Sequence, residues 1–318
     1  MSRQPTPLRP LRRLLRALLS LPLALAASSA AARDTVVILK SDDLDAYDAP
    51  IDVFRGQIGR PVEVLDVGGD KAAGERIAAS LAADPPQAIF ALGAKAAWLA
   101  ARRLPQVPMV HAMVLDPARY GISGPAVAGV RMQPPPDLVL AQLQLLAPEV
   151  KRVGIMLSTT NNDPMVGEAI QAARNAGYTV IARRLSSERD VRAALRRLPN
   201  EVDAVWLLPD PLVVTPRNFQ VLQAEAVAAR VPVLAYSEGL VQAGALLCVA
   251  PDPNTIGRLA AEQLKRHFDG ENIGVLGEAA PDTVRVVLNR ETQDAIGLVI
   301  DPSLLGFIDA VVQRPRSR

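Results

Sequence analysis

Apolar runs of strand length alternate with segments of helical length from residue 34 onward. These runs fall at 35–40, 61–67, 88–93, 108–114, 150–158, 178–185, 202–209, 231–237 and 245–250. Near-continuous apolar runs indicate strands that are covered on both faces, and their alternation with helices is typical of parallel sheets. We therefore expect an α/β chain with two doubly wound parallel sheets.

Polar residues that cap helices stand just after several of these runs. Ser187 precedes Asp190 by three residues, which is the spacing of a capping box. Further caps are expected at Thr215, Asp163, Asp252 and Asp137, the last of which follows the proline-rich "QPPPD" at 133–137. Many acidic and hydroxyl side chains are therefore expected to begin helices.

The first 32 residues have the pattern of an export signal. Residues 17–27 form an apolar stretch, Ala30-Ala31-Ala32 provides a small-residue cleavage site, and five arginines come first: Arg3, Arg9, Arg12, Arg13 and Arg16. The apolar stretch is too short to span a bilayer. An amphipathic N-terminal helix is the alternative. We expect a soluble periplasmic protein, with both the Sec and the twin-arginine export routes open.

Charge and length narrow the classes of function. The formal charge of +2 becomes −3 once the five leader arginines are removed, so nucleic acid is not an expected partner. The single cysteine, Cys248, lies in the apolar run "ALLCVA" and is expected to pack as a small hydrophobe. A chain of 318 residues is long enough to predict two lobes.

Ligands of open parallel sheets lie beyond the carboxyl ends of the strands. That rule points to the loops after the predicted strands, together with the late crossing at Pro251-Asp252. The candidate ligand-binding residues are Ser41, Asp42, Gly93, Ala94, Lys95, Asp116, Asn161, Asn162, Asp210, Ser237 and Asp252.

The sequence "GAK" at 93–95 predicts an anion site. Gly93 permits a tight turn from strand to helix, and Ala94 allows the backbone to approach a ligand. Lys95 adds a positive charge to the partial charge of the helix N-terminus, which suits a carboxylate. The alternative is a solvated lysine on the first helical turn.

Two other loops carry several polar side chains. "SDDLD" at 41–45 could receive an ammonium group or a cation, or could be an acidic cap and turn; it lacks the spaced ligands of a calcium loop. "TTNND" at 159–163 could hydrogen-bond a polar ligand, or be a loop and cap only.

Catalytic motifs do not emerge from the sequence. His111 lies inside the apolar "MVHAMV", which favours a core histidine over a base, and His267 is expected near the end of a surface helix. The sequence contains no G-x-S-x-G elbow, no metal-ligand cluster and no Walker loop. We expect no enzyme activity, no cofactor and no metal.

An ordered set of segments carries a family resemblance. The set is "DPPQAIFALGAKAAW", "VPMVHAMVLDP", "VAGV", "LAPEVKRVGIML", "VDAVWLLPD" and "VPVLAYSEGLVQAGALLCVAPDPNTIGRLAAEQL". With these segments the chain resembles the ABC-transporter substrate-binding proteins related to tryptophan-binding proteins. The resemblance implies a type I periplasmic-binding-protein fold with a three-crossing hinge, a small-molecule solute between the lobes, and an ABC permease in the inner membrane as partner.

The three crossings implied by this fold suit "QPPPD", "APDP" and the break after Gly270. The expected division is a signal peptide at 1–32, an N-terminal lobe of 34–132 plus 252–275, and a C-terminal lobe of 133–251 plus 276–318.

Departures from the family pattern leave the identity of the solute undetermined. The first helix is short, and Gly93-Ala94-Lys95 stands where relatives offer a small hydroxyl residue for the ligand's carboxylate. The expected function is the capture of a small polar, carboxylate-bearing solute between the two lobes for delivery to an ABC importer. A periplasmic sensory or accessory protein that binds a protein partner is the alternative.

We predict cleavage after Ala32, so that the exported protein begins at Arg33. Mass analysis of the periplasmic protein would check this. A mature chain that still carries Arg12 or Arg16 would contradict the prediction.

Overall fold

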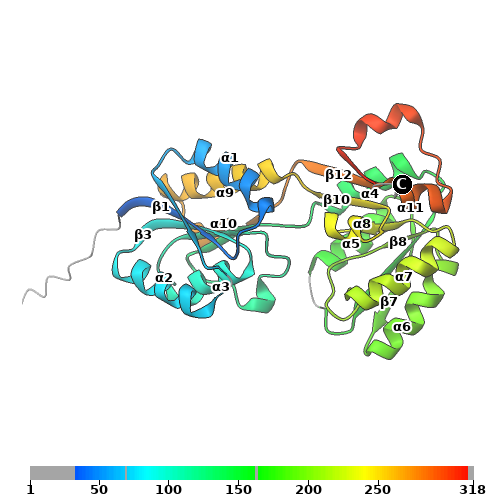
Figure 1. The fold of residues 1–318 in the computed structure, drawn as a ribbon, viewed down its shortest axis with the longest axis horizontal. Coiled ribbons are helices and arrows are strands. Elements are labelled where there is room, and N and C mark those ends of the chain that lie inside the picture. The colour runs from blue at the N-terminus through cyan, green and yellow to red at the C-terminus, as the bar shows by residue number, and fades with distance from the viewer. Residues whose placement is uncertain (1–32, 69, 162–163, 314–318) are drawn as a thin grey trace, which may run out of the picture. The chain divides into compact units, whose positions relative to one another are not determined.

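The computed structural model describes residues 33–68, 70–161 and 164–313, and the predicted signal peptide lies outside them. Within these residues the strands form two sheets, each with helices on both faces (Figure 1). The α/β class and the two parallel-dominated sheets predicted from the sequence are thereby confirmed. None of the described helices has the length and apolar character needed to span a bilayer.

The first sheet has the strand order β11-β5-β4-β3-β1-β2, and its neighbouring strands all run parallel. Its strands are β1 (Arg33–Lys40), β2 (Val62–Asp66), β3 (Pro86–Leu92), β4 (Met109–Ala112), β5 (Val127–Val130) and β11 (Glu278–Ala279). Its helices are α1 (Asp48–Ile58), α2 (Lys71–Ala83), α3 (Ala94–Arg103), α9 (Pro253–Phe268) and α10 (Ile273–Leu276).

The core of this sheet has two layers. Phe54 of α1 and Leu264 of α9 pack with Phe90 on one face, whereas Leu81 of α2 and Leu99 of α3 pack on the other. Figure 1 shows α1 and α9 together on one side of the sheet and α2 and α3 on the other. Segments far apart in the sequence therefore share one core.

The second sheet has the order β13-β12-β10-β9-β8-β6-β7 and is parallel except for the antiparallel pair of β10 and β12. Its strands are β6 (Arg152–Ser158), β7 (Thr179–Leu185), β8 (Ala204–Trp206), β9 (Val233–Ala235), β10 (Leu247–Pro251), β12 (Val284–Asn289) and β13 (Ala310–Val312). Its helices are α4 (Pro136–Leu146), α5 (Pro164–Asn175), α6 (Glu188–Arg197), α7 (Pro216–Ala228), α8 (Glu238–Gln242) and α11 (Arg290–Ile296).

The order of strands makes the chain pass between the sheets three times. It leaves the first sheet after β5, returns after β10, and leaves again between β11 and β12. The predicted boundary between 275 and 276 falls before β11, which still belongs to the first sheet because Glu278 and Ala279 pair with β5.

Several helix caps have the predicted chemistry. Ser187 accepts a hydrogen bond from the N–H of Asp190, Thr215 from that of Asn218, and Asp252 from those of Asn254 and Thr255. Asp137 does not cap α4, because the helix already begins at Pro136 and its cap position is Pro135. Asp163 lies outside the described residues.

Helix α9 packs against the backbone of α1 at Gly257. A Cβ at this position would overlap the carbonyl oxygen of Pro50, a backbone atom that cannot rotate away. Gly257 therefore sets how near the returning helix α9 can lie to α1.

We predict that Gly257→Ala lowers the free energy of unfolding by about 1–3 kcal/mol, because the added methyl group overpacks this contact. Urea unfolding would measure the loss. Gly56→Ala is the matched control: it lies within α1 with open space around its Cβ, and should stabilise the protein by about 0.5–1 kcal/mol. Equal stability of the two variants would contradict the prediction.

Candidate functional site

A cavity of about 920 Å³ lies at the carboxyl ends of strands from both sheets. Its volume falls within the range of small-molecule sites. The lining comes from α3, the loops after β4, β5, β6, β8 and β9, the start of α5 and strand β11. The residues that line it are Ala94, Met113, Val114, Leu115, Asp116, Pro117, Ala118, Arg119, Tyr120, Arg131, Met132, Gln133, Ser158, Thr160, Asn161, Pro164, Met165, Glu168, Pro209, Asp210, Pro211, Val214, Tyr236 and Glu278.

The turn that begins α3 depends on Gly93. Its φ of 85° is in the region that favours glycine, and a Cβ there would come within 2.6 Å of the Ser41 Oγ and 2.5 Å of the Tyr47 hydroxyl. Gly93 has no side chain with which to cap the helix. Ser41 supplies the cap instead, since its Oγ accepts a hydrogen bond of 2.9 Å from the N–H of Ala96.

This tertiary cap changes the interpretation of Ser41. The predicted ligand-binding hydroxyl is buried, bonded to α3 and outside the cavity lining. The first N–H groups of a helix have no intrahelical acceptor. Ser41 accepts the hydrogen bond of the Ala96 N–H, whereas the N–H groups of Ala94 and Lys95 have no acceptor within the helix. Ala94 borders the cavity.

The loops after β6 and β8 are joined by the buried carboxylate of Asp210. It accepts hydrogen bonds from the N–H groups of Ser158 (2.8 Å), Leu212 (3.0 Å) and Val213 (3.0 Å), and from the Asn161 amide (3.0 Å). Burial raises the pKa of Asp210, but these hydrogen bonds outweigh it and leave the pKa below its ordinary value. Asp210 borders the cavity, yet its oxygens are used to hold the wall together.

Apolar side chains form more of the cavity wall than the sequence suggested. Met113, Met132 and Met165 line it, together with the half-buried Tyr236 and the exposed Tyr120. Methionine is usually a core residue, so no local pattern marked these positions. Met165 follows the predicted strand at 150–158, but Met113 lies inside the predicted run at 108–114 and Met132 follows β5, which the sequence pattern did not mark.

The backbone at Met113 has a φ of 58°, a conformation that non-glycine residues rarely adopt. Such strain is often found where a side chain must be held in a functional position. Met113 directly follows β4 and lines the cavity.

Several charged groups on the cavity wall contact other side chains or the main chain. The Nη1 atom of Arg131 lies 3.5 Å from the Oε2 atom of Glu168, which makes an ion pair. The Asp116 carboxylate accepts a hydrogen bond of 3.0 Å from the backbone N–H of Arg119. Glu278 lies 3.8 Å from the Nε2 atom of His111. The wall therefore combines apolar surface with the ion pair of Arg131 and Glu168.

His111 is a core histidine, in agreement with the sequence. Its ring fills the space that the missing side chain of Gly129 leaves on β5, and burial lowers its pKa to about 4. The imidazole is therefore neutral at pH 7.

The remaining predicted site residues are dispersed. Lys95 and Asp42 are exposed, and Ser237 and Asp252 begin α8 and α9; none of the four, nor Gly93, borders the cavity. Asn162 lies outside the described residues. The structure thus gathers Ala94, Asp116, Asn161 and Asp210 around one space.

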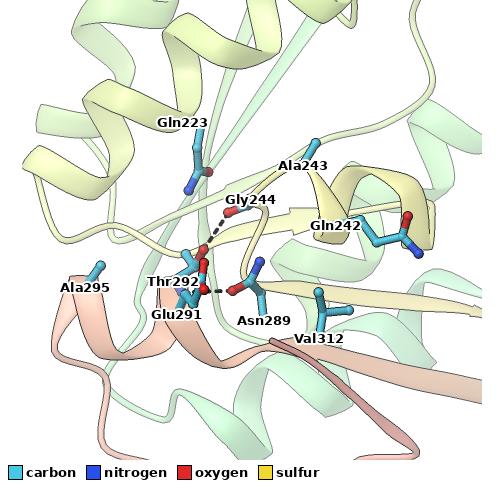
Figure 2. A pocket seen from close by; sticks show the side chains of 9 residues that line it. All are labelled: Gln223, Gln242, Ala243, Gly244, Asn289, Glu291, Thr292, Ala295 and Val312. Atoms are coloured by element: carbon cyan, nitrogen blue, oxygen red, sulfur yellow. Dashed lines mark hydrogen bonds between the residues drawn. The ribbon is translucent and has the colours of Figure 1, made fainter. Parts of the chain in front are cut away.

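A second, smaller cavity of about 270 Å³ lies beside α11 (Figure 2). Thr292 points toward the turn before β10 and donates a hydrogen bond to the carbonyl of Gly244, while its N–H is bonded to Asn289 (Figure 2). Asn289 also donates to the carbonyl of Val241. These bonds fasten α11 to the sheet, so the polar groups there have a structural use.

No group of three or more potential metal ligands is found in the part of the chain that the structure describes. The volume of the cavity and its partly apolar lining suit the binding of a small organic molecule. The model of the family described as "ABC transporter substrate binding protein" matches residues 65–312. The chain belongs to this family.

Other substrate-binding proteins are similar to it. A curated relative, the tyrosine-binding protein of Clostridioides difficile, is 24% identical over 232 residues, which are 70% of this chain and 67% of the relative. Among solved structures, a ligand-free, open substrate-binding protein with adhesive properties from Clostridium difficile matches with a TM-score of 0.68 and 20% identity, over 88% of this chain and all of that one.

A Streptococcus protein solved with L-tryptophan as an ABC domain has the same fold, with a TM-score of 0.59 and 18% identity over 87% of this chain and 99% of that one. The type I periplasmic-binding-protein fold that the sequence resemblance implied is confirmed. For a substrate-binding protein of this fold, the carboxyl-end cavity is the candidate binding site.

We predict that Asp210→Asn lowers the free energy of unfolding at pH 7 by about 1.5–3 kcal/mol, because hydrogen bonds to a buried carboxylate are lost. The lowered pKa means that the carboxylate stabilises the fold above its unfolded pKa of about 3.9, and that this contribution disappears as the pH falls through the folded value. The difference between wild type and variant should therefore shrink in acid.

Urea unfolding between pH 7 and pH 3 would measure this. Asp116→Asn serves as the control, since that exposed carboxylate accepts one backbone hydrogen bond and its loss should cost less than about 0.5 kcal/mol. A difference for Asp210→Asn that stays constant down to pH 3 would contradict the assignment.

Proposed function

We propose that the exported protein captures a small carboxylate-bearing solute in the carboxyl-end cavity and delivers it to the permease of an ABC importer. The observation that carries the proposal is the cavity of about 920 Å³, which is bordered by the first residue of α3 and by loops of the second sheet. Membership of the substrate-binding family supports transport as the context.

The carboxylate is assigned to the N-terminus of α3. The N–H groups of Ala94 and Lys95 provide two donors, and the helix dipole adds partial positive charge. The Lys95 ammonium is exposed and outside the lining, so it contributes through its field rather than by a buried contact. The main chain is therefore the proposed anchor.

The rest of the solute is assigned to the apolar wall. Met113, Met132 and Met165 offer polarizable thioethers, which contact aromatic rings favourably. One relative is named a tyrosine-binding protein, and another protein of this fold was solved with L-tryptophan. We infer that the solute is an amino acid or a similar acid with a large apolar or aromatic side chain.

Mass spectrometry of small molecules released when the purified protein is denatured tests this function. A carboxylic acid in roughly stoichiometric amount is the expected result. Absence of any released solute, together with no calorimetric binding of L-tyrosine or L-tryptophan, would reject it. Capture of a protein partner under those conditions would favour the sensory or accessory alternative.

We predict that Ala94→Pro weakens the binding of L-tyrosine or L-tryptophan about tenfold or more. Proline removes the N–H of Ala94, and a charge-assisted hydrogen bond contributes about 1.5–3 kcal/mol. Proline is accepted at the first helical position, and Gly93 before it has a ψ of 164°, outside the helical region that proline disfavours.

Ala94→Gly is the matched control, because it keeps the N–H and should bind within about threefold of wild type. Calorimetry with the corresponding amino-acid amides, which lack the carboxylate, should show no difference between the two variants. Equal affinity of Ala94→Pro and Ala94→Gly for the free acids would show that the solute's carboxylate does not bind at the N-terminus of α3.

A further inference from the structure

Gln133 stands at the first passage of the chain from one sheet to the other. It follows β5 and precedes the three prolines at 134–136. The residue is 5% exposed and lines the cavity, and its Nε2 donor has no hydrogen-bond partner in the described structure. A residue that lines the candidate binding cavity therefore carries a buried amide donor without an acceptor.

Other glutamines with a buried, unpartnered side-chain atom show how this one differs. Gln87, Gln142, Gln223, Gln263 and Gln293 each have an unpartnered Oε1 acceptor, and none of them borders the carboxyl-end cavity. Buried acceptors without partners are tolerated more readily than buried donors. Among the described glutamines with a buried unpartnered atom, Gln133 is the one in which that atom is the donor and in which the residue lines the cavity.

The chemistry of the missing partner follows from the donor. An unmet buried N–H group is costly, and a methionine or leucine would fill the same space without that cost. Arg131, two residues earlier, is paired with Glu168, so its charge already has a partner on the cavity wall. A neutral donor in such surroundings suits an oxygen of a bound molecule.

We propose that the Gln133 side-chain amide donates a hydrogen bond to an oxygen of the bound solute, which makes Gln133 a specificity-determining residue. The inference rests on the proposed function. The acceptor oxygen comes either from the solute's carboxylate or from its side chain, as in a phenol. Both sources require the same donor.

Gln133→Met tests the proposal, because it keeps the size of the side chain and removes the donor. Calorimetry with L-tyrosine, L-phenylalanine and L-tryptophan should show about tenfold or greater weakening for the probes that wild type binds. The melting temperature of the ligand-free variant should equal or exceed that of wild type, since an unpaired buried donor has been removed.

The three probes separate the two sources of the oxygen. If the variant loses affinity for L-tyrosine alone, and with it the discrimination against L-phenylalanine, the acceptor is the phenol. Equal weakening for all bound probes assigns the acceptor to the carboxylate. Either pattern supports the proposal.

Gln142→Met is the matched control, because Gln142 is a partly buried glutamine on α4 that does not border the cavity. Its affinities should be unchanged. Unchanged affinity of Gln133→Met, or a ligand-free variant that melts earlier or fails to fold, would overturn the proposal and make Gln133 a structural residue. Wild type that binds none of the probes would instead reject the proposed function, and this inference with it.

Discussion

The shared direction of the strands is the constraint on which the binding site depends. Because neighbouring strands run parallel, apart from the pair of β10 and β12, their carboxyl ends and the helix N-termini that follow meet at the same edge of each sheet. The turn at Gly93, the loop of Asp210 and the residues after β4 and β5 reach one cavity for this reason. Residues far apart in the sequence can therefore contact one small molecule.

Polar side chains at these edges are divided between structure and recognition. Ser41 and Asp252 are used as helix caps, and Asp210 holds two loops together. The contacts that we propose for a solute are main-chain N–H groups, the amide of Gln133 and apolar surface from methionine and tyrosine. Side chains that are fully hydrogen-bonded within the protein thus hold the loops that carry the proposed solute contacts.

The sequence predicted the regular parts of the fold and less of the site. Long apolar runs such as 35–40 and 150–158 were recognised because burial on both faces leaves a continuous pattern. Short strands such as β5, β11 and β13 were missed, since a few residues carry no period and are strands only through their neighbours.

The role of Ser41 could not be predicted for a similar reason, as its partner Ala96 is 55 residues away. The cavity methionines carry no chemical motif that distinguishes them from core methionines. Capping motifs, in contrast, act within four residues, and Ser187, Thr215 and Asp252 were found correctly.

The return of α9 to the first sheet also affects the order in which the chain can fold. Ile256, Leu259 and Leu264 belong to the same core as Val36 and Phe90 of β1 and β3. The core of the first sheet therefore stays incomplete until residues beyond β10 have been synthesised. A nascent chain must therefore keep this apolar surface unburied while the strands from β6 to β10 are synthesised.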